Sequence, residues 1–79
     1  MEFINRRFTP TESDLKDLGF IKDSKVKNEY DLAIHRTYIV YDANYDNWAI
    51  EPENAISSIR IFPKVKSDIE NMINLLTND

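Results

Sequence analysis

The sequence contains no cysteine and only one glycine, and both shortages exclude classes of protein. Without cysteine there is no disulfide framework, no thiolate metal site and no thiol nucleophile. A single glycine cannot supply the glycine-rich phosphate loop of a nucleotide-binding protein or a dinucleotide-binding fingerprint. No apolar run approaches the roughly 18 residues of a transmembrane helix, and the first residues lack the order of a signal peptide. We therefore expect a cytoplasmic protein that does not act in a membrane.

Positive charge is in the minority, with 10 Lys and Arg against 14 Asp and Glu, which gives a formal net charge of −4. Nucleic-acid binding usually requires a basic face that neutralises phosphates, so direct nucleic-acid binding is not expected. An acidic surface suits contact with a basic partner. The 79 residues suffice for one domain over 1–79, and a hydrophobic content of 42% is typical of a globular chain.

The N-terminal part predicts a helix over 10–18. Thr9 can serve as its N-cap and Glu12 as the residue that reaches back from position N3. Gly19 follows at the position where a left-handed conformation commonly ends a helix. Three apolar residues before this helix are expected to form a short strand or to fix the terminus against the core: Phe3, Ile4 and Phe8.

The middle of the chain predicts an antiparallel meander with strands over 32–41, 48–51 and 56–62. Apolar residues occur on both faces of the first strand, so we expect it to be central in the sheet. Polar turns rich in Asp, Asn and Pro separate the strands. Residues 21–29 contain lysines around isolated apolar residues, a pattern that fits either an edge strand or a loop.

The C-terminal part predicts a second helix over 68–76 that lies across the sheet. Ser67 and Glu70 have the spacing of a capping box. Apolar residues follow at helical spacing and should all be buried: Ile69, Met72, Ile73, Leu75 and Leu76. The expected fold class is therefore α+β, with a small antiparallel sheet of three to four strands flanked by an N-terminal and a C-terminal helix.

No arrangement of residues in the sequence indicates catalysis. His35 is the only histidine and has no neighbouring nucleophile or second metal ligand. Glu51 and Glu53 should point into water together, whereas a catalytic carboxylate pair needs two different environments. We expect no enzymatic activity, no catalytic residue and no cofactor.

A calcium-loop spacing is present but incomplete. The oxygen ligands would come from Asp42, Asn44, Asp46 and Glu53, at loop positions one, three, five and twelve of an EF-hand. Asn47 stands where the turn glycine belongs, and Pro52 prevents the exiting helix from starting. A polar hairpin turn explains the pattern better, so no metal site is expected.

Tyr45 is expected at the tip of this turn, exposed and surrounded by carboxylates. Such an aromatic resembles a protein-binding hot spot more than a platform for bases, because carboxylates repel phosphate. The simpler alternative is a turn with a solvent-exposed tyrosine that binds nothing. The residues expected to contact a partner are Asp42, Tyr45, Asp46, Glu51 and Glu53.

Four stretches carry a resemblance to small acidic proteins encoded by phages and mobile elements, of the anti-CRISPR type. They are Leu18-Gly19-Phe20, then Tyr38-Ile39-Val40-Tyr41 with Trp48-Ala49-Ile50, and Phe62-Pro63-Lys64-Val65-Lys66-Ser67. The resemblance implies a non-enzymatic inhibitor that occludes a basic nucleic-acid-binding surface of a host protein or ribonucleoprotein, such as a CRISPR effector. It implies no particular binding residue, because that group shares a strategy and not a motif.

Two alternatives remain open at this point. The chain can be a small structural or assembly protein that forms a homodimer through a sheet edge or the C-terminal helix. It can also be an RNA-binding adaptor, if its lysines gather on one side: Lys22, Lys25, Lys27, Lys64 and Lys66. The sequence leaves the oligomeric state open.

Overall fold

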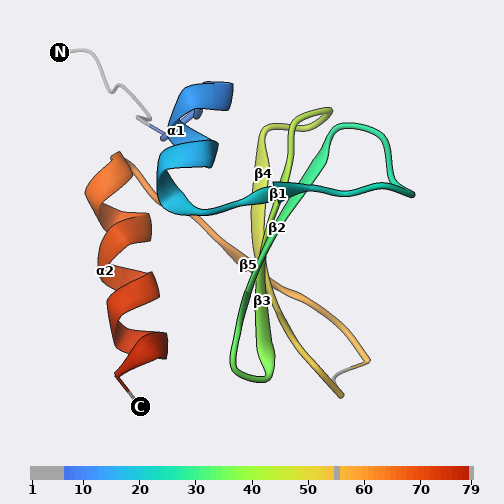
Figure 1. Ribbon diagram of the computed structural model, residues 1–79, viewed down its shortest axis with the longest axis vertical. Coiled ribbons are helices and arrows are strands. Elements are labelled where there is room, and N and C mark those ends of the chain that lie inside the picture. The colour runs from blue at the N-terminus through green and yellow to red at the C-terminus, as the bar shows by residue number, and fades with distance from the viewer. Residues whose placement is uncertain (1–6, 55, 79) are drawn as a thin grey trace, which may run out of the picture.

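The computed structural model describes residues 7–54 and 56–78, which form a five-stranded antiparallel sheet with two helices on one of its sides (Figure 1). The elements in chain order are α1 (Glu12–Leu18), β1 (Ile21–Lys22), β2 (Glu29–Ile34), β3 (Thr37–Asp42), β4 (Asn47–Pro52), β5 (Ile59–Ile61) and α2 (Lys66–Thr77). The strands have the same order in space, β1-β2-β3-β4-β5. The α+β class is confirmed, with five strands instead of three or four. The prediction for Phe3 and Ile4 falls outside the described residues.

The segment expected as a single strand over 32–41 is a hairpin. β2 ends at Ile34, which pairs with Thr37 at the start of β3. The two residues between them form the turn, and His35 has a φ of 54°. Two-residue hairpin turns need this left-handed conformation, which Asn or Gly usually supplies. The prediction was wrong because a His-Arg pair is not typical of such a turn.

The remaining strand predictions need smaller corrections. Residues 21–29, for which a strand and a loop were both possible, contain the two-residue strand β1, a loop and the first residue of β2. The expected strand over 48–51 is β4, one residue longer at each end. The expected strand over 56–62 is β5, which covers only Ile59–Ile61.

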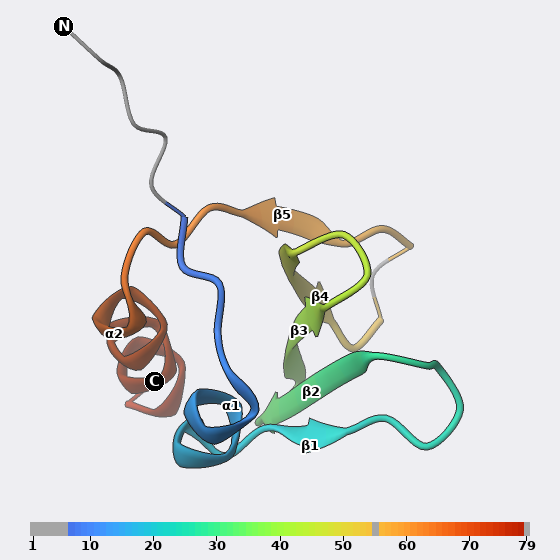
Figure 2. The ribbon, with the colours of Figure 1, turned by 90° about the horizontal axis from the view of Figure 1, so that it is seen from above.

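The core lies between the helices and the sheet face that they cover (Figure 2). Leu32 pairs with Ile39, so both point to this face, whereas a continuous strand would have put Leu32 on the face of Tyr38 and Val40. Trp48 lies at the centre of the core, and its ring centroid is 4.6 Å from that of Tyr41. The buried residues of the cluster are Leu15, Phe20, Ile34, Ile39, Tyr41, Trp48 and Ile69.

Helix α1 begins two residues later than expected. Thr11, and not Thr9, is the N-cap: its hydroxyl accepts the N–H of Asp14 at 3.1 Å, and the Asp14 carboxylate accepts the N–H of Thr11 at 3.0 Å. Asp14 therefore takes the place expected for Glu12 in the capping box. Gly19 has a φ of 94° and ends the helix as predicted.

Helix α2 begins earlier than expected, with Val65 as the N-cap in place of Ser67. The Asp68 carboxylate accepts the N–H of Val65 at 3.2 Å, so Asp68 does what Glu70 was expected to do. Leu75 is 77% exposed and was wrongly assigned to the buried stripe. The other four members contact the core as predicted: Ile69, Met72, Ile73 and Leu76. Within residues 7–54 and 56–78, neither helix has the length and apolarity needed to cross a bilayer.

Candidate protein-binding surface

One face of the sheet is turned away from both helices (Figure 2). Cross-strand partners share a face, and alternate residues along a strand return to it. The strand residues on this side, which we call the open face, are Ile21, Glu29, Asp31, Ala33, Tyr38, Val40, Asp42, Asn47, Ala49, Glu51 and Arg60. Val40 and Ala49 at its centre are only 6% and 9% exposed, so the side chains around them, and not a helix, shield them.

Negative charge dominates the open face. Its strands carry four carboxylates against Arg60 alone, and Asp23 adds a fifth directly after β1. Within the described part of the chain, no ion pair joins any of these carboxylates to a lysine or arginine. The field of these groups is therefore directed to solvent and to whatever binds this side.

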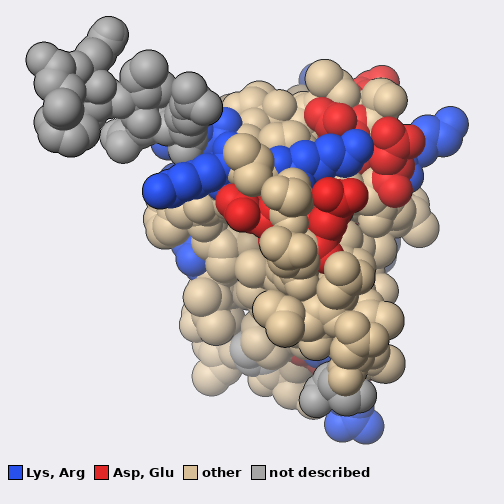
Figure 3. All heavy atoms as spheres, turned by 90° about the vertical axis from the view of Figure 1, so that its left-hand side faces the viewer, with Lys and Arg blue, Asp and Glu red and all other residues tan. Residues whose placement is uncertain are grey.

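The side of the molecule formed by the helices is different (Figure 3). Acidic and basic side chains are interspersed there, and Lys66 lies 3.5 Å from both Asp14 and Asp17. Opposite charges in such pairs largely cancel at a distance. The open face is thus a better candidate than the helical side for attracting a charged partner.

Three carboxylates at the β1–β2 end of the open face form a cluster. Asp23, Glu29 and Asp31 each place one oxygen within 4.8 Å of the others. Burial, together with a hydrogen bond to Asp23, raises the pKa of Asp31 to about 7. Burial and the charge of Asp23 raise the pKa of Glu29. Backbone N–H groups of Val26 and Lys25 lower the pKa of Asp23, so Asp23 is ionised and can accept a proton held by Asp31.

Among the described residues, this cluster is the group of three acidic side chains whose oxygens lie close enough together to contact one cation. Carboxylate oxygens are the ligands preferred by Ca²⁺ and Mg²⁺, and they also accept the N–H groups of lysine and arginine. Sequence reasoning missed the cluster because Asp23 and Asp31 approach only when β1 pairs with β2. The register that does this places Ile21 opposite Asp31. A firm strand assignment at residues 21–22 was the signal that was lacking.

The five residues expected to bind a partner do not form one group. The end of β3 and the turn after it carry Asp42, Tyr45 and Asp46. The opposite end of β4 carries Glu51, and Glu53 comes directly after that strand. The length of β4 lies between the two groups, so the expected ring of carboxylates around Tyr45 does not form. The same separation keeps the calcium-loop ligands of the sequence apart. Tyr45 itself is 78% exposed, as predicted.

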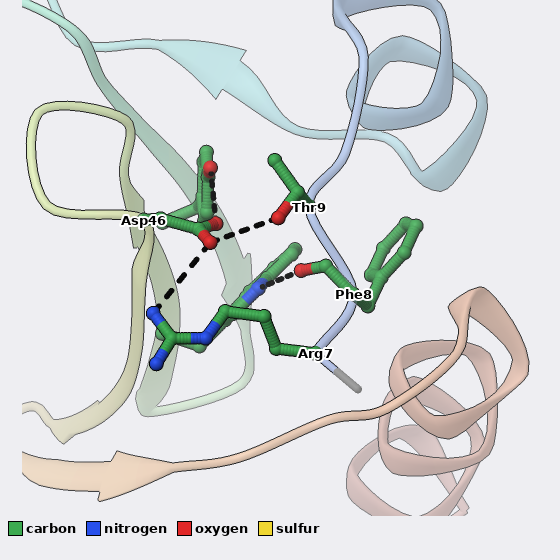
Figure 4. Close-up of polar contacts among 6 residues, drawn as sticks. Arg7, Phe8, Thr9 and Asp46 are labelled. Atoms are coloured by element: carbon green, nitrogen blue, oxygen red, sulfur yellow. Dashed lines mark hydrogen bonds and ion pairs between the residues drawn. The ribbon is translucent and has the colours of Figure 1, made fainter. Parts of the chain in front are cut away.

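The carboxylate of Asp46 makes its contacts with other residues of the same chain (Figure 4). Its Oδ2 accepts the hydroxyl of Thr9 at 2.8 Å and lies 3.6 Å from the guanidinium of Arg7, while its Oδ1 accepts the hydroxyl of Tyr41 at 2.8 Å. These contacts join the segment before α1 to the β3–β4 turn. With its oxygens already used, Asp46 has a structural role and is a poor candidate for contact with a partner.

Asp42 also has a local partner, because it accepts the N–H of Asn44 at 2.9 Å in the same turn. This bond leaves the rest of its carboxylate on the open face, where Asp42 pairs with Glu29 across the strands. Asp42 therefore remains a candidate contact residue, but as part of the open face and not as part of a ring around Tyr45.

A hollow lies at the other end of the open face, beside Glu51. It is lined by Tyr38, Glu51, Pro52, Glu53, Ile56, Ser57 and Ser58. Tyr38 and Glu51 are cross-strand partners, and the tyrosine is 42% exposed. Glu53 donates its N–H to the carbonyl of Arg36 at 2.8 Å, which fixes the chain after β4 beside the β2–β3 turn.

The lysines of the RNA-binding alternative are spread over the molecule. Lys22 lies on β1, and Lys25 and Lys27 lie in the loop that follows, whereas Lys66 begins α2 on the opposite side (Figures 1 and 2). Lys66 is also paired with two aspartates. These four lysines are therefore not gathered on one side of the molecule, which was the condition for RNA binding.

The candidate surface is thus an acidic sheet face with a carboxylate cluster at one end and an aromatic hollow at the other. Comparisons with protein-family models, curated proteins and solved structures find no match to this chain.

Proposed function

We propose that the protein is a non-enzymatic inhibitor that covers a basic, nucleic-acid-binding surface of a host RNA-guided nuclease with its open face. The partner is a host protein or ribonucleoprotein inside the cell, and the inhibitor needs neither a cofactor nor a membrane. The observation that carries the proposal is the set of five carboxylates on a sheet face that no helix covers.

The mechanism is competition for cationic side chains. A nuclease holds the phosphates of its RNA and DNA with lysines and arginines. Carboxylates on a pleated sheet lie in rows, and those that are ionised can accept charge-assisted hydrogen bonds from such side chains. The open face then occupies the groove and excludes the nucleic acid. Attraction between the two surfaces speeds their encounter and weakens as salt is added.

The strand register supports a revised choice of contact residues. Asp46 is left out because its carboxylate binds Thr9, Tyr41 and Arg7. Asp31 and Glu29 replace it, from the β1–β2 end. The revised contact set is Asp23, Glu29, Asp31, Asp42 and Glu51.

The test measures DNA cleavage by a panel of purified RNA-guided nucleases with and without the protein. Glu29→Lys and Glu51→Lys reverse charge at the two ends of the open face. Glu70→Lys makes the same charge change on an exposed position of α2 and is the matched control. We expect the two open-face variants to lose inhibition and the control to keep it. Equal inhibition by all three variants, or no inhibition of any nuclease by the wild type, would refute the proposal.

A homodimeric assembly protein is the second candidate, and β5 gives it support. This edge strand and the residue that follows it expose apolar side chains, with Ile59 at 59% and Phe62 at 72% exposed. Edge strands can pair with a strand of another copy. Light scattering coupled to size-exclusion chromatography distinguishes the candidates, because the assembly protein is a dimer and the inhibitor requires no self-association.

A further inference from the structure

We infer that the hollow lined by Tyr38, Glu51, Pro52, Glu53, Ile56, Ser57 and Ser58 is a socket for a single arginine side chain of the partner. The inference rests on the proposed function, since it names one contact that the open face makes with a basic protein. It goes further by assigning the position and chemistry of that contact.

Tyr38 provides the aromatic wall of the socket. Tyr38 is 42% exposed although it lies on β3, the central strand of the five, so its ring faces solvent from a rigid part of the sheet. Guanidinium groups stack on aromatic rings and are attracted by their negative faces. A tyrosine held by strands on both sides can accept such a group with little loss of side-chain freedom.

Two carboxylates border the same hollow. Glu51 is the cross-strand partner of Tyr38, so the carboxylate and the ring leave the sheet side by side. Glu53 lies two residues further, with its backbone fixed by the bond to the Arg36 carbonyl. A guanidinium has five N–H donors in one plane and can engage a carboxylate while it stacks on a ring.

The molecule already contains a guanidinium near this rim. Arg36 lies 3.9 Å from the Glu53 carboxylate, and the two side chains are 86% and 50% exposed. An ion pair that is long and this exposed contributes little to stability, so an arginine from a partner can displace it. The pair shows that Glu53 is within reach of a cation at this rim.

The remaining lining fits the rest of an arginine side chain. Pro52 and Ile56 offer apolar surface to its methylene groups, which long charged side chains bury readily. The hydroxyls of Ser57 and Ser58 can accept further guanidinium N–H groups. A lysine would also be attracted by the carboxylates, but it has no planar group to stack on Tyr38 and fewer donors for the several acceptors. The socket should therefore prefer arginine.

The test is a titration of the full chain with N-acetyl-arginine amide, followed by amide chemical shifts in two-dimensional NMR. N-acetyl-citrulline amide, which has the same shape without the charge, and N-acetyl-lysine amide are the comparison probes. We expect saturable shifts centred on Tyr38, Glu51, Glu53, Ser57 and Ser58 with the arginine probe, weaker ones with lysine and none with citrulline. Equal shifts with citrulline, or shifts centred elsewhere, would overturn the socket.

Variants separate the socket from the acidic face. Tyr38→Thr removes the ring but keeps a residue type that is favoured in strands, and it should weaken arginine binding roughly two- to fivefold, as an exposed cation–π contact predicts, while Tyr38→Phe retains the binding. Glu51→Gln should weaken it and Glu29→Gln should not. If Tyr38→Thr binds arginine as well as the wild type does and still inhibits the nuclease, the socket is refuted and the proposed function stands. If the arginine probe binds as expected but no nuclease is inhibited, the proposed function fails and the socket remains.

Discussion

The indole N–H of Trp48 donates a hydrogen bond to the carbonyl of Phe8 at 3.1 Å, across 40 positions of sequence. The two rings also stack, with centroids 5.7 Å apart and an angle of 17° between the planes. This pairing closes the segment before α1 over the central aromatic of the core. Asp46 reinforces it from the neighbouring turn through Thr9 and Arg7.

Asp46→Ala should destabilise the fold by about 1–3 kcal/mol, because it leaves the nearly buried hydroxyl of Tyr41 without its acceptor. Tyr45→Ala, at the adjacent exposed position, should change the free energy of unfolding by less than about 0.5 kcal/mol. Urea unfolding followed by Trp48 fluorescence measures both. Similar midpoints for the two variants would show that Asp46 does not have the structural role assigned to it.

Ile69→Ala should cost about 2–5 kcal/mol, because this side chain of α2 is 0% exposed and its removal leaves a cavity against the sheet. Leu75→Ala on the same helix removes an exposed side chain and should be nearly neutral. Thermal unfolding of the two variants checks the orientation of α2. A larger effect at Leu75 than at Ile69 would contradict the packing described.

Gly19→Ala should destabilise the protein by about 1–2 kcal/mol, because Gly19 has a φ of 94°, which L-residues adopt only with strain. Space is not the cause, since the nearest atom to an added Cβ is the Leu32 Cδ1 at an ordinary 3.6 Å. Ser13→Ala, inside α1 on its exposed side, is the control and should be neutral. An unchanged midpoint for Gly19→Ala would argue against this helix end.

The carboxylate cluster predicts a pH dependence of stability. The pKa of Asp31 is raised from its ordinary value of 3.8 to about 7 by burial and by Asp23 and Glu29, so between these two values the folded state binds more protons than the unfolded state. The free energy of unfolding must therefore fall as the pH rises towards and through 7. Glu29, whose pKa is also raised, acts in the same direction at lower pH.

Asp31→Asn removes most of this effect. Relative to the variant, the wild type should lose stability between about pH 4 and pH 8, and the two should be closest at the acidic end. Urea midpoints measured across that range decide the question. A difference between wild type and variant that does not change with pH would mean that Asp31 is ionised throughout.

Local patterns in the sequence predicted several parts of the fold correctly. Gly19 marked the end of α1, and the spacing from Ile69 to Leu76 marked the buried side of α2. The prediction failed where a local signal was weak or ambiguous. His35 adopts a turn conformation that its residue type rarely signals, and Thr9 and Thr11 both match an N-cap although only Thr11 caps the helix.

The candidate surface could be predicted only in part, because strand pairing decides which charges meet. The exposure of Tyr45 followed from turn chemistry, and the excess of carboxylates followed from composition. The division of the predicted contact residues between the two ends of β4 depends on the β3–β4 register. The approach of Asp23 to Asp31 depends on a two-residue strand, which no sequence pattern specified.

The central claim is that the open face, and not the helical side, binds a basic protein surface. The most direct measurement is the affinity of wild type, Glu51→Lys and Glu70→Lys for the inhibited nuclease at two salt concentrations. We predict that Glu51→Lys binds at least about tenfold more weakly at low salt and loses part of the salt dependence, while Glu70→Lys matches the wild type. Equal affinities and equal salt dependence for Glu51→Lys and Glu70→Lys would contradict the account.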